Sequence, residues 1–325
     1  MKNKKLFSIV LLCIFCFALS ACSNNGKTDP TKNDTKNEET NTDTTVESTN
    51  VSENKPETET EKETETETES EKETNDEKVS DTNVNKNHNG KFNANAYDVV
   101  TVREKLYNGD IDGKKLAFLT FDDGPNNDVT PRILDILKEK NVPATFFTVG
   151  KAIHEDTANV LKRIYNEGHA IATHSFSHEY EDLYPGRYPN AEYILKEEKK
   201  SIERLKSFLG EEFYTKVFRY PGGHMSWNKE GLKASDKLLQ DNNIYWIDWN
   251  SMTGDAQPKN IKQVPRPETV QKVLDNFDES ARLNGVSNVA VILMHDAIGK
   301  EITVEALPSL IDHLQKLGYE FGIIE

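Results

Sequence analysis

The stretch LAFLTFDDGP, residues 116–125, decides the fold and supplies the first candidate functional residues. Its apolar start predicts a buried β-strand over residues 116–121. Two carboxylates, Asp122 and Asp123, follow this strand directly, with a Gly-Pro turn behind them. Side chains alternate along a strand, but where the chain turns at the strand end both carboxylates can converge on one site. One could then bind a metal ion and the other move a proton. Asp-Asp-Gly also forms ordinary turns, so this stretch alone does not distinguish a functional pair of carboxylates from a turn.

Six further apolar runs predict strands, at residues 144–149, 170–173, 217–220, 244–249, 289–294 and 319–324. Segments of helical period lie between them. Pro131 and Pro267 fit the first positions of two helices, and Gly168 and Gly318 fit the positions just after two helix ends. Seven strands alternating with six helices predict parallel βαβ units. Their sheet would either stay open and doubly wound or close into a barrel.

Chemically active residue types follow the predicted strands, where a parallel barrel builds its site. They occur in HSFSH (174–178), RYPGG (219–223) and LMHD (293–296). His174 and His178 are four residues apart, so on one helical turn both imidazoles would face one cation. With Asp123 they predict a site of two histidines and one carboxylate, with positions open for water and substrate. These ligand types favour zinc, and iron, cobalt or nickel also fit them.

The first 22 residues have the pattern of a bacterial export signal. Three lysines precede an apolar run, residues 6–19, that is too short to be a comfortable membrane span. The run leads into LSAC (19–22), which resembles a lipobox. We therefore expect residues 1–21 to be removed and Cys22 to carry a lipid that anchors the chain to the membrane; a simple signal peptide with an accidental cysteine is the alternative. The chain's other two cysteines lie in the removed segment, so no disulfide is expected.

From residue 23 to about residue 91 the chain has no aromatic residue and almost no aliphatic one. This segment holds nine lysines against nineteen acidic residues, a net charge of −10 within the −15 of the whole chain. It cannot bury enough apolar surface to fold, so we predict a disordered, self-repelling acidic tether over residues 22–91. A lead-in of unassigned role (92–114) and a folded domain (115–325) follow. The domain has no basic excess, which argues against a nucleic-acid partner, and we expect a monomer.

Taken together, the predicted strand ends resemble the polysaccharide deacetylases of carbohydrate esterase family four, also called the NodB-homology family. TFDDGP, HSFSH, RYPGG and LMHD match the family's first, second, third and fifth motifs, in the family's order. The resemblance covers residues 115–325. It implies an α/β fold, a distorted (β/α)7 TIM-like barrel, which agrees with the predicted strands. It also implies a metal-dependent hydrolase that removes N-acetyl groups from a polysaccharide.

The resemblance assigns roles to the residues of these motifs. It makes Asp122 the general base and His295 the general acid. It makes Asp123, His174 and His178 the ligands of one divalent metal ion. The chemistry suits these types, because a divalent ion polarises the acetyl carbonyl and lowers the pKa of its water, while a carboxylate removes the water proton.

Three more positions acquire roles from the same resemblance. Arg219 would pair with Asp122, orienting it and favouring its charged form. Gly222 stands where many family members have a tyrosine; its N–H would help to hold the oxyanion, and its missing side chain would open the groove. Leu293 would line the pocket for the acetyl group.

The fourth motif is the weakest match. The family often shows an Asp-Trp pair whose carboxylate orients the catalytic histidine, and this chain offers Asp248-Trp249 or Asp255 within WNSMTGDA (249–256). Asp255 is preferred, because it keeps the family's spacing from the opening aromatic residue. Asp248 remains the alternative partner of His295.

The function expected is therefore N-deacetylation of an extracellular polysaccharide, with peptidoglycan N-acetylglucosamine or N-acetylmuramic acid as the first candidate. A lipid anchor and a long tether would place the domain among wall glycans on the outer face of the membrane. Chitin oligomers, poly-N-acetylglucosamine and O-acetylated xylan are alternative substrates. A non-catalytic glycan-binding lipoprotein and a solute-binding lipoprotein are alternatives of other classes; the second should show two similar lobes, and this chain has one domain.

Overall fold

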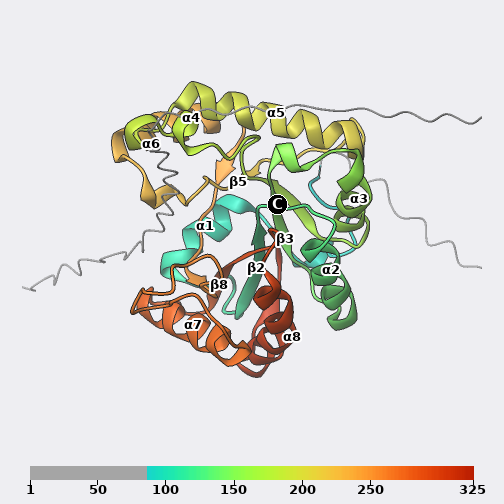
Figure 1. Cartoon of the computed structure of the whole chain (residues 1–325), viewed down its shortest axis with the longest axis vertical. Helices are drawn as coiled ribbons and strands as arrows, with labels where there is room; N and C mark the ends of the chain where they lie inside the picture. The colour runs from blue at the N-terminus through green and yellow to red at the C-terminus, as the bar shows by residue number, and fades with distance from the viewer. Residues whose placement is uncertain (1–85) are drawn as a thin grey trace, which may run out of the picture. The chain divides into compact units, whose positions relative to one another are not determined.

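A computed structural model describes residues 86–325, which form a curled sheet of parallel strands surrounded by helices (Figure 1). The strands are β1 (Ala96–Tyr97), β2 (Leu116–Asp122), β3 (Thr145–Thr148), β4 (Ala170–Thr173), β5 (Val217–Phe218), β6 (Tyr245–Trp246), β7 (Ser251–Met252), β8 (Val289–His295), β9 (Glu320–Phe321) and β10 (Ile323–Ile324). The main sheet runs in the order β6-β5-β4-β3-β2-β8-β7, with β9 also on β2, and all of these pairs are parallel. This agrees with the distorted seven-stranded barrel expected from sequence.

Helices connect the strands and cover the outer face of the sheet (Figure 1). They are α1 (Val99–Asn108), α2 (Val129–Lys140), α3 (Ala158–Asn166), α4 (Tyr180–Leu183), α5 (Ala191–Leu209), α6 (Lys229–Asp241), α7 (Val270–Leu283) and α8 (Glu301–Lys316). Side chains cap several of their amino ends, because the first N–H groups of a helix lack partners within it. Thr269, for example, accepts from the N–H of Lys272 at the start of α7.

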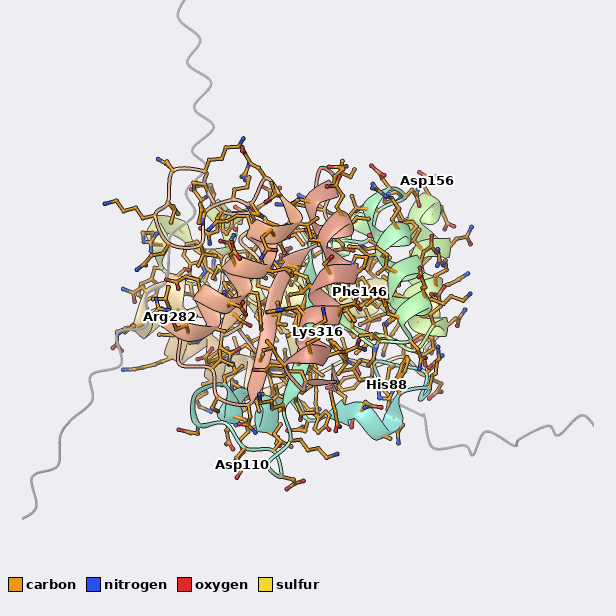
Figure 2. All side chains as sticks on the ribbon, turned by 90° about the horizontal axis from the view of Figure 1, so that it is seen from below. His88, Asp110, Phe146, Asp156, Arg282 and Lys316 are labelled. Atoms are coloured by element: carbon orange, nitrogen blue, oxygen red, sulfur yellow. The ribbon has the colours of Figure 1, made fainter. Side chains whose placement is uncertain are left out.

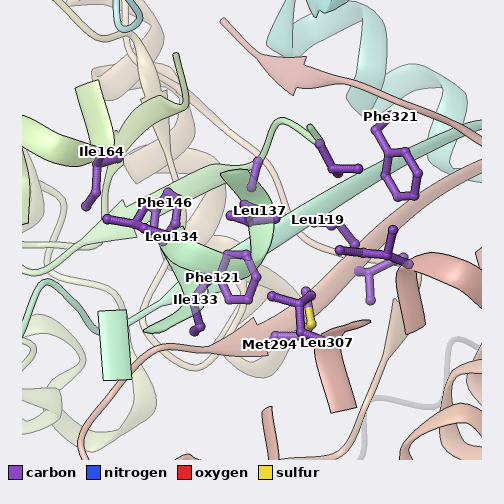
Figure 3. Packing of buried hydrophobic residues seen from close by; sticks show 14 of the residues in the cluster. Leu119, Phe121, Ile133, Leu134, Leu137, Phe146, Ile164, Met294, Leu307 and Phe321 are labelled. Carbon is purple, nitrogen blue, oxygen red and sulfur yellow. The ribbon is translucent and has the colours of Figure 1, made fainter. Parts of the chain in front are cut away.

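The alternation of side chains along the strands separates two cores. Residues of one parity on β2 and β8 pack outward against α2, α3 and α8; among those labelled in Figure 3 are Leu119, Phe121, Met294, Ile133, Leu134 and Leu307. Residues of the other parity fill the barrel interior, including Leu116, Phe118, Val289 and Val291. A strand with period 2 must do this when both of its faces are covered. The last inward position of each strand therefore lies at the carboxyl end of the barrel interior.

The lead-in, whose role the sequence left unassigned, closes the opposite end of the barrel. Val99, Val102 and Leu106 of α1 are buried against Leu116 and Val289, the first residues of β2 and β8. Each such burial contributes about 1.5 to 3 kcal/mol. Figure 2 shows the two ends: Asp110, just before β2, lies at one end of the domain, and Asp156, after β3, lies at the other.

The predicted end of the tether at residue 91 is too late. Asn87 and His88 are buried. The Asn87 carbonyl accepts from Ile171 N–H, its side chain donates to the Ile324 carbonyl, and His88 Nε2 lies 3.0 Å from Glu325 Oε2. These polar side chains pack because the domain offers them partners, which composition cannot reveal. The predicted signal peptide, Cys22 and the rest of the tether lie outside the described residues.

Some predicted element bounds are also wrong. The strand predicted over residues 319–324 is two short strands, because Gly322 separates β9, which pairs with β2, from β10, which pairs with β1. The strand predicted over 244–249 is shorter, and β7 was not predicted. Pro131 is the third residue of α2, and Pro267 lies three residues before α7, so neither occupies the first helical position. Within residues 86–325, no helix is long and apolar enough to cross a membrane.

Candidate active site

The candidate site is built from the inward positions at the carboxyl ends of four strands. On β2 the inward row Leu116 and Phe118 continues to Thr120 and Asp122. The same alternation extends Ala172 of β4 to His174, Val217 of β5 to Arg219, and Val291 of β8 to Leu293 and His295. Side-chain parity therefore brings together groups that lie far apart in the sequence.

Arg219 and Asp122 form a buried ion pair at the centre of this end. Arg219 Nη1 donates to Asp122 Oδ1 at 2.7 Å and to Thr120 Oγ1 at 2.9 Å, and its Nε donates to the Ile247 carbonyl. The guanidinium also lies 3.9 Å from the centre of the Phe147 ring. Burial raises the pKa of Asp122, although Arg219 opposes this shift. The contacts fix the orientation of the Asp122 carboxylate, as a proton acceptor requires.

Asp123, His174 and His178 meet beside this pair. Their ligand atoms all lie within 4.8 Å of one another. His178 Nε2 is 3.4 Å and His174 Nε2 is 3.7 Å from Asp123 Oδ1. Asp123 follows the strand with a φ of 80°, which lets its side chain approach the same space as the inward-facing Asp122. Two imidazoles and one carboxylate at these separations can hold one divalent cation.

The orientation of His174 supports a ligand role. Its Nδ1 lies 2.8 Å from the Arg219 carbonyl, so that nitrogen carries the proton, and the unprotonated Nε2 lies 3.7 Å from a carboxylate oxygen of both Asp122 and Asp123. Burial lowers the pKa of His174 to about 3, which keeps the imidazole neutral. Metal ligation requires a neutral imidazole, so the donor set fits a divalent ion.

The predicted helical turn between the two histidines is wrong. Residues 174–179 are a loop after β4, and α4 begins only at Tyr180. Ser175 and His178 have φ values of 60° and 57°, in the left-handed region that side-chain-bearing residues seldom adopt. The two imidazoles therefore converge through a loop of uncommon conformation. The sequence correctly predicted that His174 and His178 are neighbours, but the helical turn from which this was argued is absent.

Asp255, not Asp248, contacts His295. Asp255 Oδ1 lies 2.9 Å from His295 Nδ1, and its Oδ2 accepts from His295 N–H at 2.7 Å and from Thr303 Oγ1 at 2.8 Å. Burial opposes ionisation of Asp255, but His295, Lys300 and Thr303 together lower its pKa to about 2. This pairing leaves Nε2 of His295 as the nitrogen that can exchange a proton with a substrate.

Asp248 has a different environment. Its buried carboxylate accepts from the backbone N–H groups of His224 at 2.9 Å and Met225 at 3.4 Å. It therefore holds the turn that follows RYPGG. The choice between two acidic residues seven positions apart was open in the sequence, because Asp248 lies near the end of the strand predicted over residues 244–249 and Asp255 lies in the segment just after it.

Gly222 and Leu293 each have close apolar or aromatic neighbours. Its φ is 77°, and a Cβ atom there would lie 3.2 Å from Trp227 Cζ2 and 3.2 Å from Tyr180 Cε1. A side chain at residue 222 would therefore press against two aromatic side chains, and the open groove expected from the glycine stays a prediction. Leu293 is buried in a small cluster with Met252 and Val264.

Asp296 is a residue of the site that was not singled out from sequence. Its buried carboxylate accepts from Gly124 N–H at 2.9 Å and from Thr130 Oγ1 at 2.6 Å, so it fixes the turn behind Asp122 and Asp123. Burial raises its pKa to about 7. The sequence could have indicated Asp296, because it directly follows His295 in LMHD.

Comparisons with known proteins agree with this geometry. The family described as "Polysaccharide deacetylase" matches residues 109–239. The chain is 36% identical over 215 residues to a "Putative polysaccharide deacetylase YheN" of Bacillus subtilis, covering 66% of this chain and 68% of that one. It is 32% identical over 208 residues to a "Peptidoglycan-N-acetylglucosamine deacetylase" of Bacillus cereus, covering 64% and 68%. A solved CE4 esterase of Streptococcus mutans is 44% identical, with a TM-score of 0.68, over 74% of this chain and 96% of that structure.

Proposed function

Because the chain belongs to the polysaccharide deacetylase family, carbohydrate esterase family four, we propose that it hydrolyses N-acetyl groups of an extracellular polysaccharide, releasing acetate. The proposed substrate is N-acetylglucosamine or N-acetylmuramic acid of peptidoglycan. The similarity to a peptidoglycan deacetylase supports this choice. One observation carries the proposal: an oriented carboxylate, a three-residue metal-binding set and an Asp-paired histidine lie together at the carboxyl end of the barrel.

The proposed mechanism assigns one task to each group. Asp123, His174 and His178 would hold the divalent ion, with zinc as the proposed metal; when bound, this ion polarises the acetyl carbonyl and makes water a better nucleophile. Asp122, held by Arg219, would take the proton from the attacking water.

His295 would donate a proton from Nε2 to the leaving amine, which otherwise departs as an unstable anion. Its partner Asp255 would hold the ring and its protonated form. The Gly222 N–H would donate to the carbonyl oxygen as negative charge develops there, and Leu293 would contact the acetyl methyl group.

The pH profile tests the assigned roles of His295 and Asp255. Burial alone lowers the pKa of His295, but the charge and hydrogen bond of Asp255 outweigh burial and raise it to about 9. A general acid works only while protonated, so activity is present below this pKa and lost as the pH rises through it. Asp255→Asn removes the anion, and we expect the alkaline limb of kcat/KM to move down by about one to two pH units.

A matched control uses the rejected candidate. Asp248→Asn should leave the alkaline limb where it is in the unmodified protein, because Asp248 contacts backbone groups and not His295. A bound divalent cation lowers the pKa of His295 in the unmodified protein and in both variants alike. The test therefore compares the position of the alkaline limb between these proteins and does not depend on its absolute pH. An unchanged limb in Asp255→Asn, or equal shifts in both variants, would contradict the assignment.

We also propose a location and a state of assembly. The lipobox-like LSAC (19–22) and the acidic tether support an anchor through Cys22 to the outer face of the membrane, within reach of the wall, and we propose that the anchored protein is a monomer. The support is the sequence pattern alone.

The substrate assignment is tested by acetate release from a panel. The purified full chain should release acetate from peptidoglycan faster than from chitin oligomers, poly-N-acetylglucosamine or acetylated xylan. Faster acetate release from another polymer would identify that polymer as the better substrate and leave the enzyme class unchanged. No release from any of them, with binding to glycan retained, would favour a non-catalytic glycan-binding protein.

A further inference from the structure

The loop that carries the two candidate metal-binding histidines needs external support. It joins β4 to α4, and two of its residues, Ser175 and His178, have positive φ. The N–H of His174 still donates to the Thr148 carbonyl of β3, but the N–H groups of Ser175, Ser177 and His178 all donate to side-chain oxygens. Such a conformation persists only where the surroundings over-determine it.

Two adjacent glutamates of α5 accept hydrogen bonds from this loop. Glu198 Oε1 accepts from Ser175 N–H at 3.1 Å, and Glu198 Oε2 is also hydrogen-bonded to Thr173 Oγ1. Glu197 Oε2 accepts from Ser177 N–H at 2.6 Å. Two carboxyl groups on one helix thus hold the backbone between the two histidines at Ser175 and at Ser177.

Both glutamates are buried without a cationic partner. Glu197 is 4% and Glu198 0% exposed. Among the ion pairs of residues 86–325, none joins either side chain to a lysine, arginine or histidine. They lie on the buried face of α5, which otherwise consists of Ile194, Leu195, Ser201, Ile202 and Leu205.

Stability does not explain two carboxyl groups on this face. Burying a carboxyl group is unfavourable, and a well-packed apolar side chain of similar volume is usually as stable or more so. The catalytic groups described above do not contact either glutamate. What the two groups do satisfy is two backbone N–H groups of the histidine loop, those of Ser175 and Ser177.

We propose that Glu197 and Glu198 are positioning residues that hold the loop of residues 174–178 in the conformation in which His174, His178 and Asp123 can share one divalent cation. This inference rests on the proposed metal-dependent function. Groups that orient metal ligands commonly change metal affinity by about 10- to 100-fold when removed.

The chain offers substitutions that separate positioning from stability. Glu198→Met and Glu197→Met keep volume and helix propensity but accept no hydrogen bond from the loop. Glu198→Gln and Glu197→Gln keep a carbonyl oxygen for the same N–H, and the amide of the former can donate to Thr173 Oγ1. Ile202→Ala is the matched control: it weakens the same face of α5 without touching the loop.

The experiment measures Co²⁺ affinity by competition with a chelator, the visible absorption of bound Co²⁺, and thermal unfolding of the metal-free full chain. We expect each Met variant to bind Co²⁺ about 10- to 100-fold more weakly, with an altered spectrum and no lower melting temperature. The Gln variants should stay within about 3-fold of the unmodified protein. Ile202→Ala should melt at lower temperature yet bind Co²⁺ with unchanged affinity and spectrum.

Equal Co²⁺ affinity and spectra in the Met variants and the unmodified protein would overturn the inference and leave the proposed function standing. Weakened binding in Ile202→Ala, in proportion to its lost stability, would also overturn it, because the effect would then be general. Failure of the unmodified protein to bind Co²⁺ would overturn the proposed metal site itself, and acetate release is needed for none of these outcomes.

Discussion

Removing the divalent ion is expected to abolish acetate release, and adding back zinc or cobalt is expected to restore it. The proposed site holds the ion through two imidazoles and one carboxylate, and without the ion only the Gly222 N–H would be left to polarise the amide carbonyl. A metal ion contributes several kcal/mol to such a transition state, and each 1.4 kcal/mol is a factor of ten, so the loss should reach about 10³-fold. His178→Ala should cause a similar loss that added metal does not reverse at ordinary concentrations.

The control for this prediction is another histidine. His313 lies on α8, where its Nε2 contacts Asp278 at 2.8 Å, and it belongs to no metal-binding set among residues 86–325. His313→Ala should therefore keep both its metal content and its rate. Full activity after exhaustive chelation, verified by elemental analysis, would rule out the metal-dependent mechanism.

Asp122→Asn is expected to lower kcat by about 10²- to 10⁴-fold while the bound metal is retained, because it removes the proposed proton acceptor but none of the three metal-binding residues. The change also leaves the buried Arg219 without its anion. We therefore expect the free energy of unfolding to fall by up to about 3 to 5 kcal/mol. Acetate release, metal content and thermal melting, measured on one preparation, separate these effects.

A remote carboxylate provides the control. Asp312→Asn breaks a surface pair with Lys140 on α2 and should change neither kcat nor metal content. Retention of more than about a tenth of the rate by a folded, metal-loaded Asp122→Asn variant would show that another group accepts the proton.

Periodicity explains why most of the fold and site could be predicted. Inward and outward side chains alternate along β2, β4, β5 and β8. Extending the inward row by one position gives His174, Arg219 and His295, and extending it by two positions past Phe118 gives Asp122. These relations are local, because they depend only on the pleat of a strand and on where it ends. Element bounds failed where pairing overrode pattern, as at Gly322, where one predicted strand becomes two with different partners.

The sequence by itself determined the parallel α/β architecture, the strand ends that carry chemistry and the residue types that meet there. Only the tertiary structure decided that Asp255 and not Asp248 lies against His295, that Tyr180 and Trp227 stand beside Gly222, and that Glu197 and Glu198 support the histidine loop. It also placed Asn87 and His88 in the domain. The physical reason is range: strand alternation is set by neighbours along the chain, whereas the partner of a loop group is set by packing between segments that the sequence keeps far apart.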